Sequence, residues 1–480
     1  MESKPSYDSL LVWRVCINLT LNCMYGGYTS LAIAAALECA SWELGWGESK
    51  GDYISFLAAI FAVGAAFGGV AAGILASTYG RRKALIISDI IGISSCVILF
   101  LPSATLILAI SRITGGFAFG LMLSITPPFL KEMSPAEMSG KTGNLVQLQI
   151  CVGNLMGFIS SLFLPISETS EAAGFLWRFV LIISLIPLAV QLFMLLYVYP
   201  YDSPSWLISE RRIQEASQVI KTFYSGKGCE SIHRSLVESY AENEGPDGPV
   251  SAALVARRAS YYDVLFDWRF RRMLSIGLVL MMVQQWSGIN AVTTYASIIF
   301  ESITDRYSAR CYTVLLGVVN LTAVLCVIPI IDKYGRVPLL WMGQLALGVV
   351  LVLLGLLCMV GGPDWLIVLM LCVYLAIYIP SLGSGIWVYC GEVLNMKSMG
   401  AAVCFNWINA FFVLLSFNFI TSLGLSTAFW LYAVCCMLGS IYSSKLIETR
   451  GLTKEQICSD VIVTKNYSYL KGSQYATIVA

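Results

Sequence analysis

The feature that most constrains the fold is a series of long apolar segments that recurs along the whole 480-residue chain. A helix of about 20 apolar residues spans the hydrocarbon core of a bilayer. The sequence therefore predicts an all-α polytopic membrane protein with twelve transmembrane helices. We place these spans at residues 10–36, 53–77, 84–102, 105–128, 142–165, 174–199, 273–300, 311–331, 338–361, 366–391, 401–423 and 427–445.

Composition supports the membrane assignment and excludes several classes of function. Charged residues make up 12% of the chain and mean hydropathy is +0.75, whereas soluble proteins carry about 25% charged residues. The net charge of +1 does not indicate a basic surface that would bind nucleic acid. His233 is the single histidine, and most cysteines lie in apolar runs without metal-binding spacing. We expect no metal, no cofactor and no enzymatic activity.

A polar stretch divides the spans into two groups of six. Residues 201–272 hold ten Lys or Arg residues, and most other basic loop residues fall on the same side of the predicted membrane. The positive-inside rule places that side in the cytoplasm, together with both termini. The predicted domains are an N-terminal six-helix bundle (1–200), a cytoplasmic central loop (201–272), a C-terminal six-helix bundle (273–447) and a cytoplasmic tail (448–480).

A short basic sequence occurs at the same place in both halves. Gly-Arg-Arg-Lys at 80–83 follows the second span, and Asp-Lys-Tyr-Gly-Arg at 332–336 follows the eighth. This repetition indicates duplicated six-helix units. Transporters are commonly built in this way, with the solute site near the middle of the membrane between the repeats.

The seventh span carries an unusual group of polar residues. Gln284, Gln285 and Asn290 lie near Gly288 within an apolar run, and their spacing puts the amides roughly on one helical stripe. Burying an unpaired amide costs a few kcal/mol. The group therefore indicates either hydrogen bonding between helices or a polar solute site, and we favour the solute site.

Several further motifs occur in a fixed order. They are RITGG at 112–116, PFLKEMSP at 128–135, DSPSWL at 202–207, QQWSGIN at 284–290, WVYCGE at 387–392 and ETRGLTKE at 448–455. In this order and spacing they resemble the sugar porters of the major facilitator superfamily, which include the facilitative glucose transporters. The resemblance covers nearly the whole chain. It implies the major facilitator fold, in which two six-helix bundles give alternating access to a central site.

The resemblance also implies a set of sugar-binding residues. Neutral amides suit sugar hydroxyls because they both donate and accept hydrogen bonds, and an indole offers a flat face and an N–H. Gln147 and Asn320 have an alternative role as hydrogen bonds between helices. Asn406 and Trp407 resemble a sugar-contacting pair but lie about one helical turn from the usual position. The set is Gln147, Gln284, Gln285, Asn290, Asn320, Trp387, Asn406 and Trp407.

Gates and a charge clamp follow from the same resemblance. The expected gating residues are Gly288, Thr294, Tyr295 and Gly383. The expected cytoplasmic clamp, which would hold the bundles together, consists of Arg81, Arg82, Glu132, Asp332, Arg336 and Glu392. Ordinary solvated loop charge is the alternative. Ser77, Ser139 and Ser205 stand where the family has charged residues, so we expect a thinner clamp in the first half.

The coupling mechanism depends on intramembrane charges. Proton-driven sugar porters resemble one another in an aspartate of span one near an arginine of span four. Arg112 is present here, but residues 25–29 contain no acid. Asp89, in span three, is an isolated intramembrane carboxylate that we expect to reach headgroups or a basic loop. Facilitated diffusion is therefore favoured, with proton coupling through Asp89 and Arg112 as the alternative.

The sequence thus predicts a facilitative hexose transporter, a glucose uniporter that works by alternating access. The alternatives are a proton-coupled sugar symporter, a carrier for fructose or for a polyol such as inositol, and a non-transporting sugar sensor. We expect the partners to be a small sugar and the lipid bilayer. We also expect a functional monomer in the plasma membrane, with an endosomal membrane as the other location.

Overall fold

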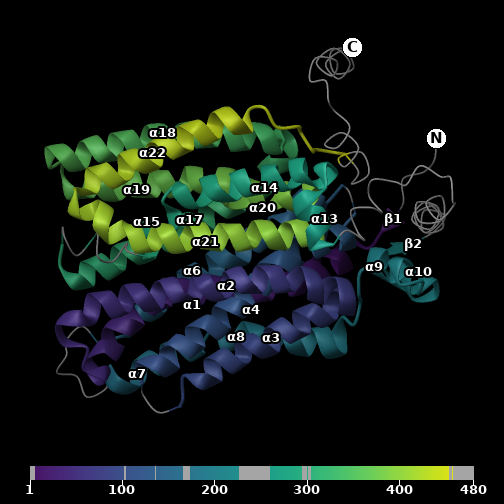
Figure 1. Ribbon diagram of the computed structural model, residues 1–480, viewed down its shortest axis with the longest axis horizontal. Coiled ribbons are helices and arrows are strands. Elements are labelled where there is room, and N and C mark those ends of the chain that lie inside the picture. The colour runs from purple at the N-terminus through teal and green to yellow at the C-terminus, as the bar shows by residue number, and fades with distance from the viewer. Residues whose placement is uncertain are drawn as a thin grey trace.

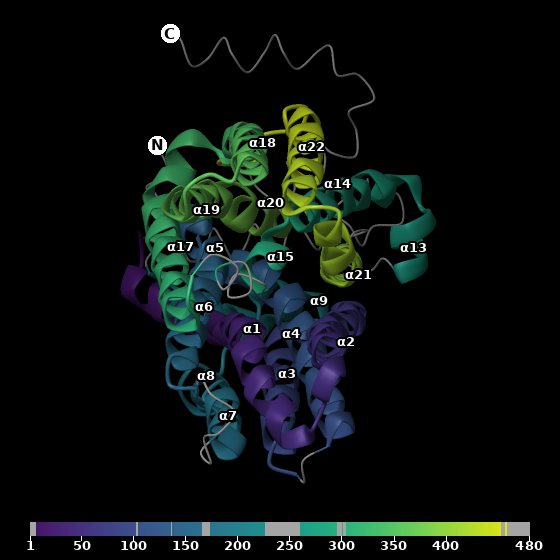
Figure 2. The same ribbon diagram turned by 90° about the vertical axis from the view of Figure 1, so that its left-hand side faces the viewer.

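The computed structural model describes residues 6–101, 104–135, 137–165, 173–225, 260–294, 300, 304–452 and 457. Its long helices form two bundles, one from each half of the chain, which lie against each other along their length (Figure 1). The view turned by 90° shows the same separation (Figure 2). The strands in this described part are β1 (Ser6–Tyr7) and β2 (Tyr224–Ser225), a short antiparallel pair.

The first bundle contains the N-terminal spans. Its sixth span is built from three consecutive pieces, α7, α8 and η2, which together cover most of the predicted segment 174–199. The elements are α1 (Ser9–Leu44), η1 (Gly47–Ser49), α2 (Lys50–Tyr79), α3 (Arg81–Ile98), α4 (Thr105–Met133), α5 (Ser139–Gly143), α6 (Leu145–Ser161), α7 (Ala173–Ile182), α8 (Leu185–Phe193) and η2 (Met194–Val198).

The polar connection between the bundles contains α9 (Pro204–Ser209), α10 (Ile213–Phe223) and α13 (Tyr261–Phe266). All three lie at one end of the molecule, beside β1 and β2 (Figure 1). We call this the inner end, and the opposite end the outer end. The helix α10 is amphipathic: it buries Ala216, Val219, Ile220 and Phe223 and leaves its polar face exposed.

The second bundle repeats the plan of the first. Two of its spans are interrupted, the seventh between α14 and α15 and the tenth at η3. The elements are α14 (Trp268–Trp286), α15 (Ile289–Thr294), α17 (Arg306–Tyr334), α18 (Arg336–Val360), α19 (Asp364–Tyr378), η3 (Ile379–Gly383), α20 (Ser384–Val393), α21 (Met396–Ser422) and α22 (Leu425–Ser443).

Eight helical segments of the described residues are long and apolar enough to cross a bilayer by themselves. The remaining predicted spans correspond to α1, α3, α6 and α14–α15, and each departs from a plain apolar helix. α1 carries polar residues such as Asn18 and Asn22, and α3 begins with three basic residues. α6 is only 17 residues long, and α14 ends at the break before α15. These four spans pack against other helices of the bundles.

Small residues let α2 approach two other helices closely. A Cβ at Gly64 or Gly68 would clash with the carbonyl oxygens of Ile113 and Phe117 on α4. On another side of α2, a Cβ at Gly69 would lie 3.0 Å from the carbonyl oxygen of Gly400 on α21. The glycines of α2 thus permit close packing of helices. The contact with α21 also places α2 at the junction of the two halves.

Candidate functional site

A cavity of about 110 Å³ lies between the two halves, and residues of both line it. α1, α4 and α6 contribute from the first half, and α14, α15, α17, α19, η3, α20 and α21 from the second. All eight residues expected from the family resemblance line this cavity: Gln147, Gln284, Gln285, Asn290, Asn320, Trp387, Asn406 and Trp407. The lining contains no acidic or basic side chain among the described residues, so the cavity is polar and uncharged.

The amides in the C-terminal half form a connected hydrogen-bonded array. Gln285 Nε2 donates to Asn406 Oδ1 over 2.8 Å, and Asn290 Nδ2 donates to Gln285 Oε1 over 2.6 Å. Asn406 Nδ2 donates to Gln284 Oε1 over 2.9 Å, and Gln284 Nε2 reaches the carbonyl of Leu382. Each amide therefore fixes the orientation of the next. Despite its one-turn offset in the sequence, Asn406 is part of this array.

Two buried polar atoms of the cavity lining have no hydrogen-bond partner in the described part of the chain. They are Asn320 Oδ1 and Trp407 Nε1. The Trp407 ring packs edge-on against Phe61 and Phe119 of the first half, with centroids 5.9 and 5.7 Å apart. Leaving a buried donor or acceptor without a hydrogen bond costs free energy. A ligand that both donates and accepts hydrogen bonds would donate to Asn320 Oδ1 and accept from Trp407 Nε1.

The expected gating glycines lie where the backbone departs from a regular α-helix. Gly288 separates α14 from α15 and has φ +87°, and a Cβ there would clash with the Tyr432 ring. Gly383 is the last residue of η3, a wide π-helical turn that contains Pro380. Thr294 ends α15. The side chain of Thr294 and the whole of Tyr295 lie outside the described residues.

Two ion pairs at the inner end each join residues of the same half, whereas the predicted clamp joins the two bundles. Arg81 holds Glu132 through two hydrogen bonds of 3.0 and 3.1 Å, and Arg336 holds Glu392 at 3.0 Å. Both members of each pair belong to the same bundle. The family spacing identifies charged residues that meet, but not which helices they join.

One contact between the halves at the inner end joins Glu392, an expected clamp residue, to two residues outside the expected set. Lys131 Nζ on α4 lies 3.7 Å from Glu392 Oε1 on α20, and Ser139 Oγ donates to the same oxygen over 3.4 Å. Ser139 stands where the family has an arginine. The Ser139 hydroxyl thus contacts Glu392 more weakly than an arginine at this position would. The motif PFLKEMSP contains Lys131, so the sequence carried a signal for it.

Two other expected clamp residues behave differently. Arg82 Nε donates to the carbonyl of Leu195 over 2.9 Å, inside the first half. This hydrogen bond joins α3 to the end of the sixth span, and the clamp role of Arg82 stays a prediction. The side chain of Asp332 lies outside the described residues.

Two carboxylates that were not predicted as site residues cap equivalent helices. Asp202 Oδ1 accepts from the backbone N–H of Arg81 over 3.0 Å at the start of α3. Glu448 accepts from the backbone N–H groups of Arg336 and Val337, over 3.0 and 2.9 Å, at the start of α18. Burial raises the pKa of Asp202, although the backbone N–H groups oppose this shift. The motifs DSPSWL and ETRGLTKE contain these two carboxylates.

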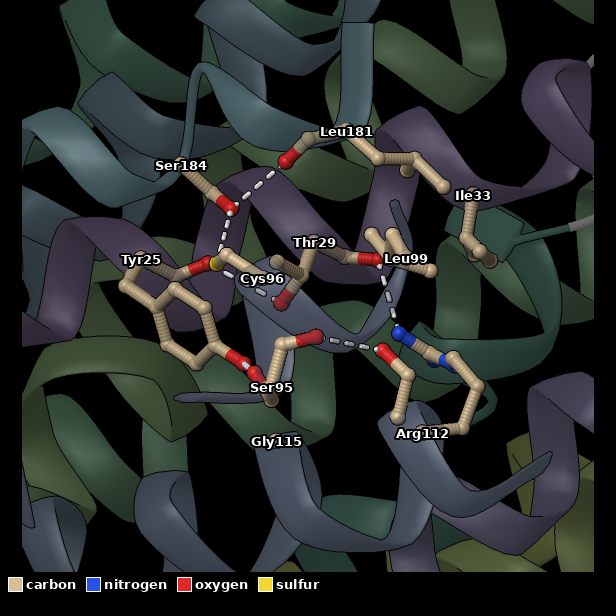
Figure 3. A pocket seen from close by; sticks show the side chains of 11 residues that line it. Tyr25, Thr29, Ile33, Ser95, Cys96, Leu99, Arg112, Gly115, Leu181 and Ser184 are labelled. Carbon is tan, nitrogen blue, oxygen red and sulfur yellow. Dashed lines mark hydrogen bonds between the residues drawn. The ribbon is translucent and has the colours of Figure 1, made fainter. Parts of the chain in front are cut away.

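A second and smaller cavity, about 20 Å³, lies inside the first bundle beside Arg112 (Figure 3). Arg112 is buried and donates to the carbonyl oxygens of Thr29 and Leu57 over 3.3 and 3.2 Å. Its guanidinium carbon lies 4.3 Å from the centre of the Phe61 ring. No carboxylate pairs with it in the described part of the chain, so backbone dipoles and an aromatic face stabilise this cation.

Asp89 lies in the same bundle but is fully buried. Neither carboxylate oxygen has a hydrogen-bond partner among the described residues. The expectation that Asp89 reaches headgroups or a basic loop is therefore wrong. It faces the interior because α3 packs against α4 and α8 on this side.

Two similar bundles around a neutral cavity, with polar contacts at the inner end, define a membrane carrier for a small polar solute. Comparison with known proteins agrees with this class. Residues 15–460 match the family described as "Sugar (and other) transporter", and the chain belongs to that family. It is a sugar transporter and not an enzyme.

Individual relatives extend over most of the chain. The galactose-proton symporter of Escherichia coli is 27% identical over 406 residues, which cover 82% of this chain and 83% of that protein. The facilitated trehalose transporter Tret1 of Drosophila yakuba is 27% identical over 477 residues, which cover 95% of this chain and 52% of that protein. The proton:xylose symporter XylE bound to 6-bromo-6-deoxy-D-glucose has a similar structure, with a TM-score of 0.81 and 23% identity over 94% of this chain and 99% of that one. The predicted major facilitator fold is confirmed.

Proposed function

We propose that the protein carries a hexose such as glucose across the membrane by facilitated diffusion and alternating access. The observation that carries this proposal is the uncharged cavity between the halves, with Asn320 Oδ1 and Trp407 Nε1 left unpaired. A hexose presents hydroxyl groups that donate and accept, so it can satisfy both atoms. A net hydrogen bond contributes about 0.5–1.5 kcal/mol, which gives the weak binding that a carrier needs for release.

The size of the cavity supports a monosaccharide. A volume of about 110 Å³ is the space of roughly eight water molecules. A single pyranose ring with its hydroxyls matches this scale, whereas a disaccharide requires substantially more room. One chain supplies every wall of the cavity, so we propose that the monomer is the working unit.

The surroundings of Arg112 support transport without proton coupling. Backbone carbonyls of Thr29 and Leu57 accept its hydrogen bonds, and the adjacent stretch 25–29 of α1 has no acid that could exchange a proton with it. The hydrogen-bond partners of the guanidinium are therefore backbone carbonyls, which do not titrate. We infer that its charge is fixed through the transport cycle.

The test is counterflow of labelled glucose into proteoliposomes without a proton gradient. Gln285→Ala removes two hydrogen bonds of the amide array and should abolish uptake. Gln344→Ala is the matched control, because Gln344 is a buried amide of the second bundle that does not line the cavity. Equal uptake by both variants would contradict the site. If glucose is not carried, fructose and inositol are tested next. Binding without flux would favour a sugar sensor.

Proton-coupled symport is the second candidate, and Asp89 is the observation that favours it. An unpaired carboxylate charge in a fully buried position is expensive, so Asp89 is where a transported proton would reside. The symporters among the relatives belong to this class. Uptake that accumulates sugar only under an inward proton gradient, and that Asp89→Asn uncouples, would replace the uniport proposal.

The position of the basic residues supports an orientation. We propose that the inner end, with α9, α10 and α13, faces the cytoplasm, and that the protein resides in the plasma membrane. Protease accessibility of a tag placed at either terminus, in intact and in permeabilised cells, tests the orientation.

A further inference from the structure

Arg310 is a buried cation at the outer end of the molecule, on the second turn of α17. Only 3% of its surface is exposed. Nη1 donates to the carbonyl oxygens of Ser161 and Leu164 over 3.2 and 2.7 Å, and Nη2 donates to the carbonyl of Pro165 over 3.3 Å. These three carbonyls lie at and just beyond the end of α6. Arg310 belongs to the second bundle, whereas α6 belongs to the first.

The chemistry of this contact is that of a helix C-cap supplied by another part of the chain. The last turn of an α-helix leaves carbonyl groups without partners, and its partial negative charge favours a cation. One guanidinium, a planar group with five donors, can satisfy several such carbonyls. No carboxylate pairs with Arg310 in the part of the chain that the structure describes.

The same two helices touch closely further into the molecule. A Cβ at Gly317, two turns along α17, would lie 3.0 Å from Leu155 Cδ1 and 3.2 Å from Leu155 Cα on α6. The seam between α6 and α17 is therefore a direct contact of the two halves. Arg310 closes this seam at its outer end, and Lys131 with Ser139 and Glu392 joins the halves at the inner end.

We propose that Arg310 is an outer latch: its hydrogen bonds to the end of α6 hold the halves together outside the cavity and must break before the cavity opens outward. The inference rests on the proposed alternating-access mechanism. It names a positioning residue, since Arg310 does not line the cavity. Because the contact is made to main-chain carbonyls, only a change at Arg310 itself can remove it while leaving α6 intact.

The experiment measures outward opening without any sugar. Ser30 lines the cavity on α1, and a cysteine introduced at Ser30 reports access for a membrane-impermeant maleimide from outside. The same chain without that cysteine corrects for reaction at native cysteines. A cysteine introduced at Val388, which packs against the Gly143 position of the other half near the inner end, reports access from the cytoplasmic side.

Arg310→Gln should raise the labelling rate at position 30 roughly tenfold, since one charged hydrogen bond is enough for such a shift. Labelling at position 388 should fall. Arg310→Lys keeps the charge but not the planar group of donors, so its effect should be smaller. The control is Arg178→Gln, because Arg178 pairs with Glu43 at 2.8 Å inside the first half.

The two reporters separate the latch from other outcomes. If Arg310→Gln unfolds the protein, labelling rises at both positions. The Arg310→Lys variant, which retains a cation at the helix end, then tests the latch. Unchanged labelling at position 30 in folded Arg310→Gln and Arg310→Lys would overturn the latch. Since no sugar is present, failure of the proposed hexose specificity would leave this result unaffected.

Discussion

The indole of Trp407 combines two properties at one position. Its ring joins the halves through Phe61 and Phe119, and its N–H has no partner among the described residues although it is buried beside the cavity. The first property concerns packing and the second concerns ligand recognition. A substitution that keeps an aromatic ring but removes the N–H distinguishes them.

Trp407→Phe should therefore weaken sugar binding while leaving the fold intact. Loss of one hydrogen bond of about 0.5–1.5 kcal/mol corresponds to roughly a two- to tenfold increase in KM for counterflow. The control is Trp365→Phe, because Trp365 is 67% exposed and does not line the cavity. The same KM in both variants would show that the Trp407 N–H does not meet the sugar.

At the scale of elements, the break between α14 and α15 shapes the cavity. Gly288 has φ +87°, which costs other residues roughly 1–2 kcal/mol, and the Tyr432 ring occupies the space of a side chain. Three cavity residues, Gln284, Gln285 and Asn290, flank this break. The conformation of Gly288 therefore sets the relative positions of the amides.

Gly288→Ala should lower thermal stability and abolish counterflow, because it adds backbone strain and a clash that costs about 1–3 kcal/mol. Gly51→Ala is the comparison, since Gly51 lies in a helix with open space around it. The measurements are the Tm of the purified protein and the initial rate of uptake. Normal transport by Gly288→Ala would mean that the break is not required.

The pattern of apolar residues predicts the helices better than it predicts their contacts. The long apolar runs specify where spans lie because the bilayer imposes a length, and the amides of span seven stand out because lipid excludes them. The partners of Glu392 and Arg82 depend instead on how α4, η2 and α20 pack. For that reason Lys131, Asp202 and Glu448 were missed although their motifs were recognised. The wrong expectation for Asp89 has the same cause, since burial is set by neighbouring helices.

At the scale of the whole molecule, Glu392 holds two kinds of contact. It pairs with Arg336 inside its own bundle and with Lys131 across the inner end. All three groups are largely buried, which makes the loss of a partner costly. A change at this residue should therefore alter the balance between the inward-open and outward-open states.

Glu392→Gln should favour opening toward the inner end and raise cytoplasmic labelling of a cysteine at Val388 at least roughly tenfold, because breaking a buried ion pair costs about 3–5 kcal/mol. The comparison is Glu132→Gln, which breaks the pair with Arg81 inside one half. Glu132→Gln should lower the Tm with little change in labelling. Equal labelling in both variants would mean that the contact with Lys131 does not hold the halves together.

The caps on α3 and α18 have a consequence for biosynthesis. Asp202 follows the sixth span and Glu448 follows the twelfth. Each bundle is therefore capped by a carboxylate from the segment that directly follows its own last span. The first bundle can complete its own capping contacts on the ribosome before the second has been translated. Two fragments divided within the central loop should therefore insert separately and assemble into an active carrier when they are co-expressed.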